Sequence, residues 1–220
     1  MRRKPLLLQA CLLAGVAVGG ASCVAPAPSM GASSSQAMSQ ELEIVQGRTL
    51  RYGGQAVLGF VDVFEAGKAS LDLWHEGEKL WLARLQVGRG DIFPVGGHFL
   101  RVAELLEADE GTRARLRLDE VADAGGLRAA DATHPVLVEG GVLEVGLSRV
   151  AFAGEPAAGH APVEVWPKVQ KREKVAPADL ERSELAVGGT LAFGNRRLQV
   201  VRIQPRAGEV LGYVEFEVLP

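Results

Sequence analysis

Cysteine is scarce in this chain. The 220 residues include only Cys11 and Cys23, and both lie near the N-terminus. From residue 24 onward there is no thiol, so neither a disulfide nor a thiolate metal site can stabilise the folded part. Stability must therefore come from the burial of apolar side chains, for which a composition that is 47% hydrophobic is ample.

Long apolar runs are also missing. The run from Leu6 to Val18 is shorter than the roughly 20 apolar residues that a permanent membrane-spanning helix needs. It follows Arg2-Arg3-Lys4 and precedes Gly20-Ala21-Ser22. Basic, apolar and small residues in this order are typical of an export signal. We therefore interpret residues 1–22 as a signal peptide rather than a retained membrane anchor.

The end of this segment, Ala21-Ser22-Cys23, resembles the lipobox of bacterial lipoproteins, in which small residues precede the cysteine that begins the mature protein. The resemblance implies cleavage before Cys23, acylation of Cys23 and attachment to the membrane through this N-terminal lipid. Gly20 stands where the lipobox usually has an aliphatic residue, which leaves simple secretion as the alternative. Val24 is not the aspartate that retains lipoproteins at the inner membrane in enterobacterial sorting, so the resemblance favours the outer membrane of the cell envelope.

Charged residues are absent from Val24 to Gln40, where Ala, Pro, Ser, Gly, Met and Gln dominate. Such a composition has too little apolar surface to offset the entropy lost on ordering the chain. We interpret residues 23–40 as a lipidated cysteine followed by a flexible tether.

From Glu41 onward, apolar and polar residues alternate in short segments such as residues 70–73, 114–118 and 212–218. Glycine pairs separate these segments, and a period of two is typical of strands with one buried face. The sequence therefore predicts an all-β fold with short turns and little helix. We expect one exposed helical turn, at Ala178–Arg182 after Pro177.

The two halves of this region resemble each other in order and pattern. Five segments of the first half have counterparts in the second, among them Leu71–Trp74 with Val163–Trp166 and Val87-Gly88 with Val187-Gly188. This favours two related small β-sandwich or β-barrel units in tandem, at 41–121 and 136–220, with a linker at 122–135. The alternative is that any two antiparallel β segments share alternation and glycine turns.

Catalytic and metal-binding patterns are missing. The four histidines are scattered without ligand spacing, which favours loop or strand-surface positions, and no Gly-x-Ser-x-Gly elbow occurs. We therefore predict no catalytic residues, no metal and no cofactor, and expect that the protein is not an enzyme. The formal net charge of −3 becomes more negative once the basic signal is removed, so nucleic acid is not an expected partner.

Leu80, Trp81 and Leu82 begin a segment that is apolar on both sides of a predicted strand. Such a strand is either buried between layers or exposed at a binding surface. We take these three residues as candidate partner-binding residues.

The signal, the tether and the lack of a catalytic cluster lead us to expect a non-catalytic binding or scaffolding module of an envelope assembly, of secretion, adhesion or motility type. Its partner would be an envelope protein. The first alternative is a lipocalin-like periplasmic carrier, in which a closed barrel would enclose a small apolar ligand. The second is an envelope hydrolase, which would need a polar cleft built from residues distant in sequence.

Overall fold

The computed structural model describes residues 41–220 apart from 66, 78–79, 110–111 and 194–195. The predicted signal peptide, Cys23 and the tether lie outside the described residues. The described residues all belong to one compact unit. Within the described ranges, the structure has no helix with the length and apolar character needed to cross a membrane.

The described residues are almost entirely strands and turns, which confirms the all-β prediction and is consistent with β-sandwich or barrel units. Two short 3₁₀ turns, η1 (Arg172–Lys174) and η2 (Pro177–Asp179), are the helical elements of the described part. The strands are β1 (Glu41–Val45), β2 (Thr49–Tyr52), β3 (Ala56–Glu65), β4 (Lys68–His75), β5 (Trp81–Gly88), β6 (Ile92–Val95), β7 (His98–Leu106), β8 (Arg115–Val121), β9 (Val136–Val138), β10 (Val142–Val145), β11 (Ser148–Phe152), β12 (His160–Pro167), β13 (Glu181–Ala186), β14 (Thr190–Phe193), β15 (Arg196–Gln204) and β16 (Tyr213–Leu219).

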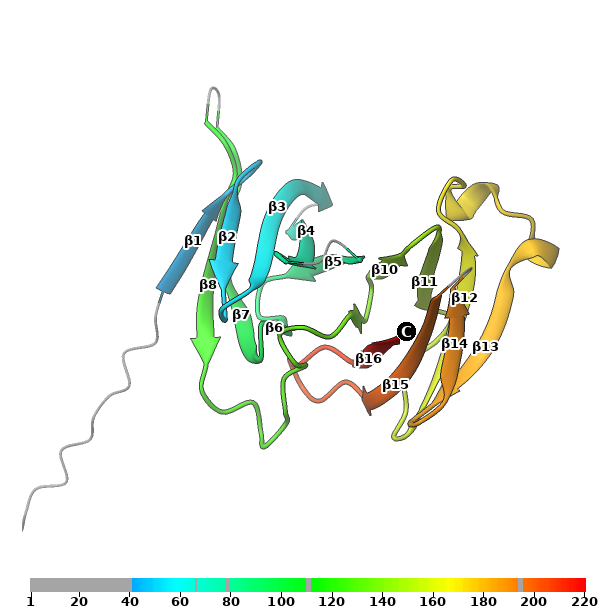
Figure 1. Ribbon diagram of the computed structural model, residues 1–220. Coiled ribbons are helices and arrows are strands. Elements are labelled where there is room, and N and C mark those ends of the chain that lie inside the picture. Colours follow the sequence, from blue (N-terminus) through cyan, green and yellow to red (C-terminus); the bar gives the residue numbers. More distant parts are fainter. Residues whose placement is uncertain (1–40, 66, 78–79, 110–111, 194–195) are drawn as a thin grey trace, which may run out of the picture. The chain divides into compact units, whose positions relative to one another are not determined.

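The strands form three antiparallel sheets, in which one strand order occurs twice (Figure 1). In the first half, coloured blue to green, β1-β8-β7-β6 form one sheet and β2-β3-β4-β5 contribute to another. The second half has β9-β16-β15-β14 and β10-β11-β12-β13 in the corresponding orders. The two four-strand groups β2–β5 and β10–β13 join into a single eight-stranded sheet because β5 pairs with β10.

The pairing registers of the two halves also correspond. β7 pairs with β8 through a bulge between Val102 and Glu104, and β15 pairs with β16 through a bulge between Val200 and Arg202. Both bulges fall at the same place in their strands. The shared strand order therefore extends to the local irregularities of the ladders.

One of the expected correspondences is wrong by two residues. The sequence matched Val87-Gly88 with Val187-Gly188, but the structure aligns Gly90 with Gly188. The backbone N–H of each donates at 2.8 Å to the carbonyl of the bulge residue, Val102 or Val200. A Val-Gly pair can precede a turn at any position of a ladder. This match in the sequence therefore could not show which residues of the two halves are equivalent.

The core is continuous across the two halves. Alternate residues of neighbouring strands, such as Leu58, Leu71 and Leu85, are fully buried and belong to one apolar cluster that includes Leu143 of the second half. The expected linker, residues 122–135, contains no strand, and its Ala130 is buried in the same cluster. The sheet pairing and the shared core together hold the halves in one unit.

The expected helix at Ala178–Arg182 is wrong. The chain makes only the η2 turn at Pro177–Asp179, and Glu181 already begins β13. Glu181 pairs with Val165 and Arg182 with Glu164 of β12. The ladder to β12 therefore overrides the local helical preference of this segment.

Candidate functional site

The outer face of the eight-stranded sheet carries charged and aromatic residues where β4, β5 and β10 meet. Strand alternation buries Leu71 and Leu73 and leaves Asp72 and Trp74 of β4 on this outer face. The indole of Trp74 lies over Gly59 of β3, where an added Cβ would come within 3.1 Å of the ring.

A pocket of about 470 Å³ opens on this face. The predicted partner-binding residues Leu80, Trp81 and Leu82 come together here, with Trp81 buried and both leucines half-buried. The pocket therefore has apolar and aromatic walls with charged groups at its rim. The remaining lining residues are Asp72, Trp74, Glu144, Gly146, Lys168 and Arg196.

The acidic groups of the rim are paired with bases. The Asp72 carboxylate accepts a hydrogen bond of 2.9 Å from Nε of Arg84 on β5. Glu144 of β10 forms ion pairs of 2.7 Å with both Arg149 and Lys168. Burial raises the pKa of Glu144, but the hydrogen bonds from Lys168 and Arg149 outweigh it and leave that pKa below its ordinary value. The rim is therefore charged but locally neutralised.

The second half has the same arrangement with a cover over it. Glu164 of β12 is the counterpart of Asp72, and Arg182 of β13 is the counterpart of Arg84. Glu164 forms an ion pair with Arg182, as Asp72 does with Arg84. Glu164 also binds Arg172, whose hydrogen bond is the main reason why the pKa of Glu164 is lowered. The covering segment thus contributes directly to the ion pairs of this face.

Residues 168–175 form this cover. Lys168 binds Glu144, the carbonyl of Gln170 faces Arg149 at 3.5 Å, and Arg172 binds Glu164. Trp166, the counterpart of Trp74, is only 3% exposed. Trp74 is half-buried at the pocket, and the connection from β4 to β5 is shorter than that from β12 to β13.

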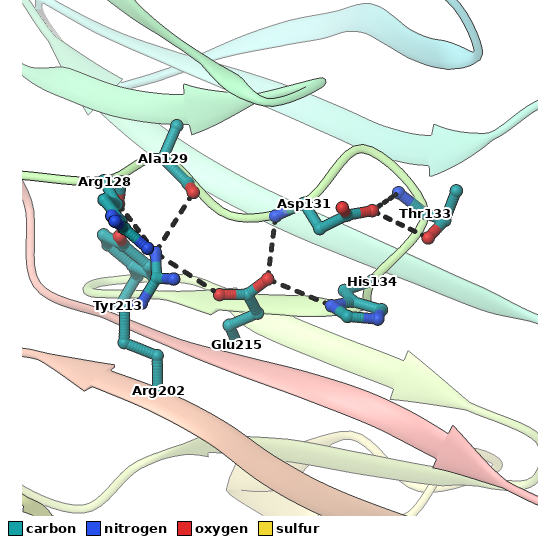
Figure 2. A network of polar contacts seen from close by, with 8 residues as sticks. All are labelled: Arg128, Ala129, Asp131, Thr133, His134, Arg202, Tyr213 and Glu215. Carbon is teal, nitrogen blue, oxygen red and sulfur yellow. Dashed lines mark hydrogen bonds and ion pairs between the residues drawn. The ribbon is translucent and has the colours of Figure 1, made fainter.

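A separate polar network fastens the segment before β9 to β16 (Figure 2). Figure 2 shows the Glu215 carboxylate facing the backbone N–H of Asp131, which donates at 2.8 Å, and Nδ1 of His134 at 3.0 Å. Arg202 lies 3.6 Å from the second oxygen of Glu215. This buried acid therefore binds groups from two other segments, the one before β9 and β15, and we assign it a structural role.

The same network includes backbone carbonyls of residues 128 and 129. Arg202 donates to the carbonyls of Arg128 and Ala129 at 3.1 and 3.2 Å, and the hydroxyl of Tyr213 donates to that of Arg128. Alternation alone missed the site, because Tyr213 to Phe216 are all buried and Glu215 read as an exposed polar residue. No local motif in the sequence marks it.

The histidines do not converge. His98 pairs with Glu120 at 3.0 Å and His134 with Glu215, whereas His75 is buried, contrary to the expectation of a loop or strand-surface position. Over the part of the chain that the structure describes, no group of three or more His, Cys, Asp or Glu residues is placed to hold a metal ion.

Comparison with known proteins finds no match to this chain among family models, curated proteins or solved structures. The site is therefore interpreted from its own geometry.

Proposed function

We propose that this protein is a lipid-anchored module of the cell envelope that binds a protein partner without catalysing a reaction, and that the pocket beside Trp74 is the contact. One observation carries the proposal. Trp74 and Asp72 line an open pocket, whereas the counterpart of Asp72, Glu164, binds Arg172 of a segment of the chain itself, and the counterpart of Trp74, Trp166, is buried. A partner segment would lie against the pocket of the first half as residues 168–175 lie against the equivalent face of the second half.

The chemistry of the pocket suits such a segment. Leu80, Leu82 and the indole of Trp74 offer apolar surface, and aromatic anchors of this kind dominate many protein interfaces. Asp72 pairs with one arginine, Arg84, whereas Glu164 pairs with two, Arg182 and Arg172. We expect the partner to present a basic side chain toward Asp72 and an apolar one toward Trp74.

The N-terminal segment supplies the location in this proposal. Export by residues 1–22, lipidation at Cys23 and a tether to residue 40 would hold the folded part near the outer membrane while leaving its surface free. A flexible chain of this length spans on the order of 20–25 Å.

We also propose that the two halves arose by duplication of one eight-stranded unit. The shared strand order, the matching bulges and the repeated acid–arginine pairs support it. Under this proposal, residues 168–175 are an insertion that closed the second site and left the first one open.

A carrier of a small apolar ligand is the second candidate, because the pocket volume of about 470 Å³ lies in the range of small-molecule sites. Native mass spectrometry of the purified protein distinguishes the two. A bound small molecule that Leu82→Glu removes would favour the carrier.

Crosslinking in intact envelopes tests the partner proposal. Leu82→Glu places a charge in the pocket and should abolish a discrete crosslinked complex while leaving the thermal unfolding temperature within a few degrees of wild type. Gln86→Glu is the matched control, since Gln86 lies on the same face of β5 but outside the pocket lining, and it should retain the complex. Capture of the monomer alone from wild-type envelopes would refute the proposal.

A further inference from the structure

The two outer edges of the eight-stranded sheet differ in their capacity to accept a further strand, and the strand order shared by the two halves shows this difference. The sheet ends at β2 on one side and at β13 on the other. The counterpart of β2 in the second half is β10, whose edge is not free because it pairs with β5. The β5–β10 junction is therefore a template for what the edge of β2 can accept.

The junction has a defined chemistry. Leu143 of β10 lies opposite Ala83 of β5, and Val145 lies opposite Trp81. All four side chains are buried in the common core. The core thus continues across the junction because β5 offers two kinds of residue to β10. A small residue lies opposite the leucine, and a large apolar residue stands two positions earlier in β5.

β2 presents the same acceptor pattern. Leu50 and Tyr52 stand at the positions of Leu143 and Val145, as their pairing with the adjacent strands shows. Both are only half-buried, and Thr49 and Arg51, which alternate with them along β2, are exposed. Among the described residues, the sheet order continues no further than β2 on this side.

Backbone groups are also available at this edge. The carbonyl of Arg48 accepts a hydrogen bond from the N–H of Phe60 on β3. In an antiparallel pair, alternate residues bond to the same neighbour, so Leu50 and Tyr52 bond toward β3. The N–H and C=O groups of Thr49 and Arg51 therefore face away from β3, toward the open edge.

The opposite edge cannot act as the donor. β13 is the counterpart of β5, and Glu181 stands opposite Val165 as Ala83 stands opposite Leu73. Two residues earlier, at the sequence position that corresponds to Trp81, Asp179 lies in the η2 turn, outside the ladder to β12. Both acids are exposed, and charged side chains on an edge strand protect that edge against strand addition. A second copy of this chain therefore cannot continue the sheet through β13.

We propose that the edge of β2 binds an extended segment of another protein as an added antiparallel strand. The segment would place a small residue opposite Leu50 and a large apolar residue opposite Tyr52, with main-chain hydrogen bonds to Thr49 and Arg51. This surface is distinct from the pocket beside Trp74, and the inference does not depend on the function proposed for that pocket.

Two peptides from the chain itself provide the test. The probe is a synthetic peptide with the sequence of residues 81–87, from β5, and its matched control has the sequence of residues 179–185, from the equivalent stretch before and within β13. Each is added to the full-length protein in detergent, and binding is measured by anisotropy of the labelled peptide. Amide hydrogen exchange locates the contact.

The β5 peptide should bind and slow exchange at Thr49 and Arg51, and the β13 peptide should not. Arg51→Pro removes the outward N–H and should weaken binding by about tenfold or more, whereas Arg51→Ala keeps the N–H and should bind like wild type. Glu184→Pro, on the edge strand β13, controls for proline in an edge strand. Leu82→Glu should leave peptide binding unchanged, which separates this surface from the pocket.

Three results would overturn the inference: equal binding of the two peptides, unchanged binding to a folded Arg51→Pro variant, or no slowing of exchange at Thr49 and Arg51. If Arg51→Pro fails to fold by circular dichroism, the comparison of the two peptides and the location of exchange protection decide the question.

Discussion

Glu104 on β7 and Arg117 on β8 form an ion pair of 3.1 Å just beyond a β-bulge. The equivalent pair in the second half is Arg202 with Glu215, so acid and base have exchanged strands. The exchange preserves attraction across the ladder while changing the surroundings. Glu104 is 45% exposed in its side chain, whereas Glu215 is 3% exposed.

This difference in burial predicts unequal costs for the same substitution. Glu215→Gln removes the charge that Asp131 N–H, His134 and Arg202 face, and should lower the free energy of unfolding by about 1.5–3 kcal/mol. Glu104→Gln changes an exposed pair and should cost less than about 1 kcal/mol. Urea unfolding followed by tryptophan fluorescence measures both. Equal losses would contradict the structural role of Glu215.

Two equivalent glycines offer a second matched comparison. Gly53 and Gly146 have φ values of 57° and 56°, but a Cβ on Gly53 would lie 2.2 Å from the carbonyl oxygen of Gly96, while one on Gly146 would meet nothing within 4 Å. Gly146→Ala should cost about 1–2 kcal/mol for the left-handed conformation alone. Gly53→Ala should cost a further 1–3 kcal/mol or so from overpacking. Thermal unfolding of the two variants would show no difference if this close contact did not exist.

The ion pairs of Glu164 predict acid sensitivity. Hydrogen bonding from Arg172 holds the pKa of Glu164 in the folded state below the ordinary value of 4.5. The unfolded chain therefore binds the proton first, so this contribution is complete above about pH 4.5 and is lost as the pH falls through the folded-state pKa. Urea midpoints between pH 7 and pH 3 should fall less steeply in Glu164→Gln. Glu173→Gln, an exposed acid of the same segment, is the control, and identical slopes in wild type and Glu164→Gln would contradict the assignment.

Lipidation predicts a change of cell fraction. Cys23→Ala should release the protein from the membrane fraction and abolish incorporation of labelled fatty acid, because it removes the thiol that is proposed to carry the lipid. Cys11→Ala lies within the predicted signal and should retain both properties. Fractionation with metabolic labelling measures the outcome. A wild-type protein found only in the soluble fraction would refute the lipobox interpretation.

Much of the fold followed from alternation. A segment such as Leu71–Trp74 buries every second residue, so its pattern in the sequence predicts the strand and its inner face together. The order of the related segments was readable for the same reason. Val87-Gly88 failed because two turn residues carry no information on which rung of a ladder they occupy.

The candidate site was only partly predictable. The apolar pattern at Leu80 to Leu82 marked the start of β5, and the structure places all three residues in the lining of the pocket. Their binding of a partner stays a prediction. The charged rim was not predicted, because Asp72, Glu144 and Lys168 meet only after β5 pairs with β10. The structural role of Glu215 could not be predicted for a similar reason, because its partners lie far away in the sequence.

The strand order of the first half also constrains when its sheets can form. Strands β2 to β5 pair with their immediate neighbours along the chain, so short turns suffice to close them. β1 must wait for β8, whose Arg115 pairs with Val45 from about 70 residues away. Contacts of such long range are slow to form because the entropy of loop closure is lost before they are gained. Under the proposed export from the N-terminus, β1 would therefore remain unpaired until nearly the whole first half had emerged on the far side of the membrane.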